Sequence, residues 1–249
     1  MNNPPPMDTN QAPGAEATAQ FARGAMLYDA SRLGQPTPDV FDREYWRQRG
    51  GLEEMAGGRG TIAFLRRDGL RWVLRHYCRG GFMTNFSRDG YLWTGEARAR
   101  SFLEWRLLRQ LIVWQLPVPV PVAARYVRDG LLYRADLITE ELPTRLTVAQ
   151  GLREGPLAES RWRQIGRCVG ALHARGVHHA DLNAHNLLLG EGETVYVLDF
   201  DKGRIRERGA WEQAVLHRLH RSLEKVTFGL PADRFGEPQW QWLLEGCGR

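Results

Sequence analysis

Short stretches of alternating apolar and polar residues run through the chain up to about residue 140, which is the pattern of half-buried β-strands. We expect strands at 25–29, 61–65, 71–77, 125–127, 131–134 and 137–141. Asp68-Gly69 and Asp129-Gly130 lie between neighbouring strands and predict tight hairpin turns. Apolar residues at helical spacing predict helices at 36–49 and 96–112.

Beyond residue 142 the apolar residues recur mainly at helical spacing. The expected helices are 160–175, 211–225 and 239–244, with short strands at 187–189 and 194–198. Gly176 follows the first of these helices and is a typical helix stop.

Strands first and helices later are typical of an α+β fold with two lobes. We therefore predict a single domain of residues 21–249, with an antiparallel-sheet N-lobe of about 21–141 and a mostly helical C-lobe of about 142–249. Residues 1–20 are rich in Pro, Asn, Ala and Gln, and their composition predicts a flexible tail.

Composition describes an ordinary soluble globular chain, with 249 residues, 43% hydrophobic and 25% charged. No apolar run approaches the roughly 20 residues of a membrane span, and the polar, Pro-rich start does not resemble a secretory signal. The net charge of +5 favours phosphates or an anionic membrane surface as partners. We expect no nucleic-acid partner, because the chain has neither a zinc-finger spacing nor an RNA-binding aromatic signature.

The most informative motif lies at residues 179–186, where Asp181 follows His179 by two positions and Asn186 follows Asp181 by five. The apolar stretch 195–198 then leads to a second acid, Asp199. Phosphoryl transfer needs a carboxylate that accepts or orients the proton of the attacking hydroxyl, which we assign to Asp181. It also needs oxygen ligands for Mg²⁺ on the ATP phosphates, which we assign to Asn186 and Asp199.

These residues and several others resemble the protein-kinase superfamily, most closely its lipopolysaccharide-core branch. The resemblance covers roughly residues 25–225 and rests on Val73-Leu-Arg75-His-Tyr77, Arg79-Gly-Gly81, Ser101-Phe102, Glu104, Thr139-Glu140, 179–186, 198–203 and 218–223. It implies a kinase-like two-lobed fold that uses ATP and Mg²⁺.

The resemblance also implies roles in nucleotide binding for residues of the N-lobe. Arg75 stands where a kinase places its phosphate-gripping lysine, and Glu104 would pair with it. Gly58 and Gly60 lie where a phosphate-covering loop belongs, although the G-x-G-x-x-G spacing is not kept. Glu140, with its neighbour Glu141, would offer backbone groups to adenine.

Two departures from protein kinases argue against a signalling role. Ala180 replaces the usual arginine of the catalytic loop, so that an activation-loop phosphate has no partner there. Asp201 replaces the glycine of Asp-Phe-Gly, and the segment 201–211 is too short for a regulatory loop.

The implied reaction is transfer of the ATP γ-phosphate to the 4-hydroxyl of 3-deoxy-D-manno-octulosonic acid (Kdo) on a Kdo–lipid A precursor. It would occur at the cytoplasmic face of the inner membrane, with peripheral binding to its anionic surface. Three alternatives remain: a heptose kinase of the same branch, a distant small-molecule kinase such as an aminoglycoside phosphotransferase, and a pseudokinase module that binds without turnover.

Overall fold

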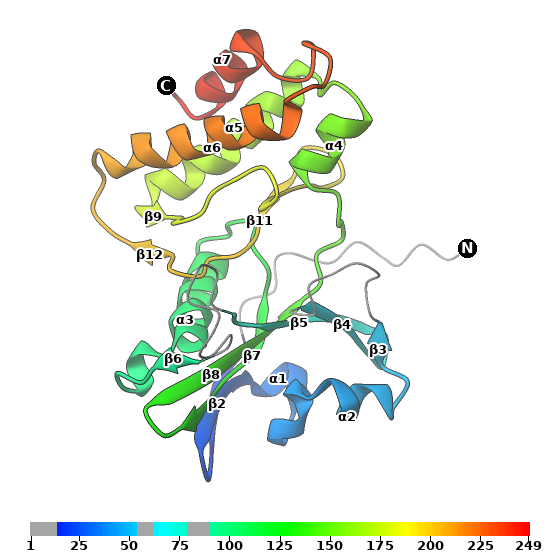
Figure 1. Ribbon diagram of the computed structural model, residues 1–249, viewed down its shortest axis with the longest axis vertical. Coiled ribbons are helices and arrows are strands. Elements are labelled where there is room, and N and C mark those ends of the chain that lie inside the picture. Colours follow the sequence, from blue (N-terminus) through cyan, green and yellow to red (C-terminus); the bar gives the residue numbers. More distant parts are fainter. Residues whose placement is uncertain (1–13, 54–61, 79–89) are drawn as a thin grey trace. The chain divides into compact units, whose positions relative to one another are not determined.

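An antiparallel sheet occupies the first part of the chain in the computed structural model, which describes residues 14–53, 62–78 and 90–249 (Figure 1). The main path of the sheet runs β1-β2-β7-β8-β5-β4-β3, and β6 also pairs with β8. The strands are β1 Glu16–Phe21, β2 Gly24–Asp29, β3 Leu52–Glu53, β4 Ile62–Arg67, β5 Leu70–His76, β6 Tyr91–Leu92, β7 Pro121–Asp129 and β8 Leu132–Glu140. The predicted antiparallel sheet is thus confirmed.

The predicted hairpin between β4 and β5 is confirmed by its backbone angles. Asp68 and Gly69 both have positive φ, 49° and 79°. A two-residue turn with both central residues in this region matches the twist of the flanking strands. The register therefore places Arg75 opposite Ile62 on one side and Leu137 of β8 on the other.

The prediction of a flexible tail over residues 1–20 is wrong for its last part. Residues Glu16–Phe21 form β1 and pair with all six residues of β2. Composition misled the prediction here, because the strand is polar on one face and depends on β2 for its backbone hydrogen bonds. Residues 1–13 lie outside the described part of the chain.

The two faces of the sheet carry different residues of β5. Trp72 and Leu74 belong to an apolar core with Trp46 of α2 (Arg43–Arg47), with α1 (Ala30–Leu33) and with the 3₁₀ turn Pro38–Phe41. Because side chains alternate along a strand, Arg75 points to the opposite face. On that face lies α3 (Arg100–Val113), which follows the short 3₁₀ turn Glu96–Arg98.

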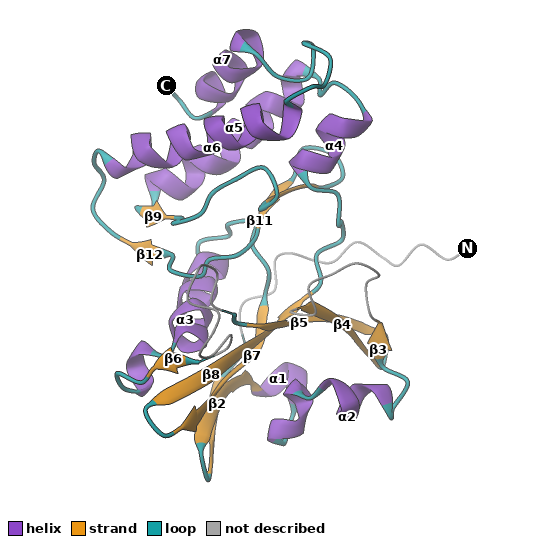
Figure 2. Cartoon of the chain, in the orientation of Figure 1, coloured by secondary structure: helices purple, strands orange, loops and turns teal. Residues whose placement is uncertain are grey.

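Helices dominate the second part of the chain (Figure 2). They are α4 Val148–Glu154, α5 Glu159–Ala174, α6 Trp211–Thr227 and α7 Glu237–Gly246, with the short strands β9 Val177–His178, β10 Leu187–Leu189, β11 Val195–Val197 and β12 Arg204–Ile205. Helix α4 was missed in the sequence, although Thr147 and Gln150 form a reciprocal capping box at its start. The α+β class predicted from the sequence is confirmed.

The chain forms two compact units. One comprises Ala12–Gln110 and Val120–Glu141, and the other includes Leu111–Pro119 and Leu142–Arg249. The segment 111–119 therefore belongs with the helical unit, where Pro117 accepts a hydrogen bond of 2.9 Å from the amide of Val197. Among the described residues, no helix is both long and apolar enough to cross a lipid bilayer.

Gly176 lies between α5 and β9, just before the 179–186 loop, and allows a close contact with the segment around Arg206. This glycine has φ of 69°, and its carbonyl accepts a hydrogen bond of 2.9 Å from the amide of Arg206. A Cβ at position 176 would lie 2.3 Å from the Arg206 carbonyl oxygen. Only glycine permits this approach, which pairs β12 with β9 and ties the short segment after Asp201 to the start of the loop.

His173 of α5 provides a test of the packing beneath this loop. Its side chain is buried against the Trp211 ring, and burial lowers its pKa to about 4. The fold therefore favours the neutral ring, and stability is complete above the ordinary pKa of about 6.5. Below it, we expect the free energy of unfolding to fall by about 1.4 kcal/mol for each pH unit until about pH 4.

Chemical denaturation of the wild type and of His173→Gln at pH 7 and pH 5 measures this contribution. The variant should lose less stability than the wild type between the two pH values, because glutamine does not titrate. Equal losses in both proteins would contradict the assignment.

Candidate active site

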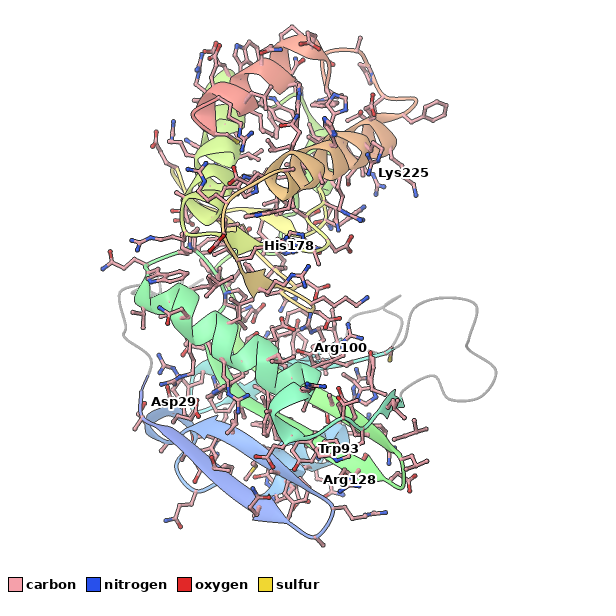
Figure 3. The ribbon with its side chains drawn as sticks, turned by 90° about the vertical axis from the view of Figure 1, so that its left-hand side faces the viewer. Asp29, Trp93, Arg100, Arg128, His178 and Lys225 are labelled. Carbon is pink, nitrogen blue, oxygen red and sulfur yellow. The ribbon has the colours of Figure 1, made fainter. Side chains whose placement is uncertain are left out.

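His179 holds the loop that carries the candidate catalytic residues. It follows His178, the last residue of β9 (Figure 3). Its Nε2 lies 2.8 Å from the carbonyl oxygen of Leu198, its Nδ1 accepts the Asp181 amide at 3.2 Å, and its ring packs on Phe200. These contacts require a neutral ring protonated on Nε2, and burial lowers the His179 pKa accordingly. The ring therefore joins the loop to the segment that contains Asp199.

Asp181 is fixed in place while its carboxylate remains accessible. The Asn183 side-chain amide donates to the Asp181 backbone carbonyl at 2.9 Å and approaches its Oδ2 at 3.4 Å. Arg218 of α6 donates to Oδ1 at 3.2 Å. The Asp181 side chain is nonetheless 59% exposed, so that an acceptor hydroxyl can reach it.

Asn186 and Asp199, the predicted metal ligands, are brought together by the main chain. The Leu198 amide donates to the Asn186 carbonyl at 2.8 Å, which places Asp199 at the next position along. The Asn186 amide nitrogen donates to the Asp181 carbonyl at 3.0 Å and leaves its Oδ1 as the atom for a cation. Asp199 has φ of 61°, a left-handed conformation that aspartate tolerates and that is frequent at functional sites.

This donor set suits Mg²⁺. One amide oxygen and one carboxylate are hard ligands, and Mg²⁺ is usually bound by one or two protein oxygens together with substrate phosphates. Within the described ranges, no cluster of three or more His, Cys, Asp or Glu side chains forms a closed metal site. The oxygen ligands of Asn186 and Asp199 match the number and type that Mg²⁺ takes from a protein when substrate phosphates also bind it.

In the strand-rich unit, Arg75 and Glu104 form the ion pair that the sequence predicts. The Glu104 side chain is only 3% exposed and Arg75 is 21% exposed. Tyr77 supports both, since its hydroxyl donates to Glu104 at 2.5 Å and accepts from Arg75 at 3.1 Å. A buried carboxylate thus holds a guanidinium, the planar group whose geometry matches phosphate oxygens.

The predicted contact of Glu140 and Glu141 with adenine depends on which of their backbone groups are available. The amides of Glu140 and Glu141 already donate within the sheet, to Val120 and Arg71, both at 2.8 Å. The two amides are therefore engaged within the protein, and the backbone contact of Glu140 and Glu141 with adenine stays a prediction. The Glu140 carboxylate accepts a hydrogen bond of 2.7 Å from Arg32.

The predicted phosphate-covering glycines, Gly58 and Gly60, lie outside the described residues.

The contact of Arg218 with Asp181 was not predicted from the sequence, where Arg218 stood only within the stretch 218–223 that carries part of the family resemblance. Its neighbour at i+4, Ser222, lies on the same side of α6 and accepts the Ala184 amide at 3.1 Å. The only sequence feature that could have indicated this contact is the spacing of Arg218 and Ser222, which places both on the same side of the helix.

Two features define a kinase-like phosphotransferase. One is the order of Asp181, Asn186 and Asp199 along the chain, and the other is a strand arginine paired to a buried helix glutamate. The model of the lipopolysaccharide kinase (Kdo/WaaP) family matches residues 43–246. The chain belongs to this family.

Named relatives agree with the family match. A 3-deoxy-D-manno-octulosonic acid kinase of Vibrio parahaemolyticus is 39% identical over 80% of this chain and 83% of its own. The kinase of the same name from Xylella fastidiosa strain 9a5c is 43% identical, over 82% of this chain and 81% of its own. The kinase of the same name from Photobacterium profundum is 39% identical over 91% of this chain and 95% of its own.

Proposed function

We propose that this protein transfers the γ-phosphate of ATP to the 4-hydroxyl of Kdo on a Kdo–lipid A precursor. The observation that carries the proposal is the position of Asp181, accessible to a hydroxyl and held on the same loop as Asn186. The acceptor is supported by the relatives, which are named as kinases of 3-deoxy-D-manno-octulosonic acid and match most of the chain.

Each residue of the helical unit has a distinct part in this proposal. Asp181 accepts or orients the proton of the acceptor hydroxyl, and Asn183 and Arg218 hold its carboxylate in place. When bound, Mg²⁺ supplies positive charge that neutralises the triphosphate, and Asn186 and Asp199 would hold it. His179 keeps the two parts of the loop in register through Leu198.

In the strand-rich unit, Arg75 binds phosphate oxygens of the nucleotide. Its guanidinium is permanently charged and presents donors in a planar fork that matches phosphate. Glu104 and Tyr77 fix its direction.

The experiment that tests the function is transfer of labelled γ-phosphate from ATP-Mg²⁺ to Kdo–lipid A precursor. Label on this glycolipid supports the proposal. Label only on a heptosylated core would keep the reaction type and replace the acceptor with heptose. Nucleotide binding without transfer to either acceptor would favour a pseudokinase.

We further propose peripheral binding to the anionic cytoplasmic face of the inner membrane. The acceptor is itself a lipid, and α6 exposes His217, Arg218, Arg221 and Lys225, the last labelled in Figure 3. Phe228, directly after α6, is 91% exposed. An exposed aromatic ring beside basic residues is typical of surfaces that contact lipid headgroups.

Co-sedimentation with vesicles tests the membrane proposal. Arg221→Glu/Lys225→Glu should weaken binding to vesicles that contain anionic lipid by at least about ten-fold, because each basic residue contributes about 1 kcal/mol near such a surface. Binding to zwitterionic vesicles should be weak for both proteins. Equal binding of the variant and the wild type to anionic vesicles would contradict the role of this surface.

A further inference from the structure

We infer that Arg218 binds the carboxylate of the acceptor sugar and thereby directs the acceptor hydroxyl toward Asp181. The inference rests on the proposed function and assigns the recognition of the acid group to one residue of α6. It begins from the direct contact between the Arg218 guanidinium and the Asp181 carboxylate, 3.2 Å from Nη1 to Oδ1.

The position of Arg218 is determined by the packing of α6. Leu219 and Leu223, on the inner side of the helix, are almost fully buried. Ser222, one turn after Arg218, accepts the amide of Ala184 in the catalytic loop. The helix is therefore joined to the loop both by apolar packing and by a hydrogen bond, so that the base of the Arg218 side chain is fixed beside Asp181.

The ion pair can open at little cost. The Arg218 and Asp181 side chains are 49% and 59% exposed. Ion pairs in such settings contribute about 0–1 kcal/mol, because water solvates both partners well. A guanidinium has five N–H donors, and a second carboxylate can be bound by its fork without a large penalty.

The contacts of Asp181 divide the loop into two sides. Its Oδ2 faces Asn183, whose carbonyl accepts the amide of Asn186, the candidate metal ligand. Its Oδ1 faces Arg218. The Asn183 side therefore leads to Asn186, which would hold Mg²⁺ on the nucleotide, and we assign the α6 side to the acceptor.

The chemistry of the acceptor fits this arrangement. A hydroxyl that donates to Asp181 lies about 3 Å from its carboxylate, which brings the rest of the sugar ring next to Arg218. An octulosonic acid carries a carboxylate on that ring. An arginine binds a carboxylate through two parallel hydrogen bonds, and this fixes orientation as well as affinity.

The test compares two acceptors, the Kdo–lipid A precursor and the same molecule with the Kdo carboxylate converted to its amide. For the wild type, KM should be lower for the acid than for the amide. Arg218→Gln should raise KM for the acid about ten- to a hundred-fold, the loss expected for a hydrogen bond to a charged group. KM for the amide and KM for ATP should stay close to the wild-type values, and Arg218→Lys should recover part of the affinity for the acid.

The matched control is Arg163→Gln. Arg163 of α5 also forms partly exposed ion pairs, with Glu159 at 2.8 Å and with Glu245. Its substitution should leave all three KM values unchanged. Thermal unfolding of each variant shows whether the fold is intact, and Arg218→Lys serves as the second variant if Arg218→Gln is unstable.

Four results would overturn the inference. An equal rise in KM for the acid and the amide would mean that Arg218 only positions Asp181. A rise in KM for ATP would place Arg218 on the nucleotide. If the wild-type protein transfers phosphate to neither acceptor, the proposed function fails and the inference fails with it. If the wild type transfers phosphate normally but Arg218→Gln shows no rise in KM that is specific to the acid, only the inference is rejected.

Discussion

Asp181→Asn should lower kcat for phosphate transfer by roughly a hundred- to ten-thousand-fold, the usual contribution of a positioned proton acceptor. Asparagine keeps the shape of the side chain, and its single side-chain oxygen can still accept from Arg218, whereas the 3.4 Å approach of the Asn183 amide to Oδ2 is lost. It cannot take up a proton at neutral pH. The loss should therefore fall on the chemical step, while the affinity for ATP-Mg²⁺ changes little.

Labelled-phosphate transfer and calorimetric titration with ATP-Mg²⁺ separate these two effects. Asp233→Asn is a suitable control, because Asp233 is 60% exposed and lies in the turn before α7. Its kcat should equal that of the wild type. If Asp181→Asn retained more than about a tenth of the wild-type kcat, a role as proton acceptor could not be maintained.

Arg75→Met should both destabilise the protein and weaken nucleotide binding. The substitution removes the Arg75 partner of the buried Glu104 carboxylate, and loss of one partner of a buried ion pair typically costs about 3 kcal/mol of unfolding free energy. It also removes the guanidinium that we propose grips the phosphates. Unfolding by denaturant and titration with ATP-Mg²⁺ measure the two losses.

Two further variants separate stability from binding. Arg75→Met/Glu104→Met replaces the whole pair with apolar side chains and should recover most of the stability but not the nucleotide affinity. Arg125→Met is the matched control, since Arg125 pairs with Asp136 in the same sheet at 2.6 Å and has the same 21% exposure as Arg75.

Arg125→Met should be destabilised like Arg75→Met, yet its folded fraction should bind nucleotide normally. If both single variants lost nucleotide affinity equally, the loss would reflect the damaged sheet and not a phosphate contact by Arg75.

Local signals explain why most elements could be predicted from the sequence. The Asp68-Gly69 turn requires two residues that tolerate positive φ, and this requirement is visible in the residue types. Helix α6 has its buried leucines at helical spacing. Strand β1 was missed because its apolar content is low and its partner β2 supplies its hydrogen bonds, a long-range condition that a window of residues does not contain.

The candidate site divides in the same way. Asp181, Asn186 and Asp199 lie within one short stretch, so that their spacing carries the chemistry and could be read directly. The pairing of Arg75 with Glu104 was predicted through the family resemblance, and the structure contains this ion pair. The hydrogen bonds of the Glu140 and Glu141 amides to Val120 and Arg71 join segments that are distant in the chain, and only the tertiary structure shows them.

The sequence by itself determined the reaction class, since the residue types of the loop, their spacing and their order are all local properties of the chain. Tertiary structure alone decided what surrounds Asp181. Arg218 lies 37 positions away in the chain and reaches Asp181 only because α6 packs its leucines inward and turns its polar side to the loop. Burial and long-range contact depend on the whole fold, and for this reason the residue that we propose recognises the acceptor could not be identified from spacing.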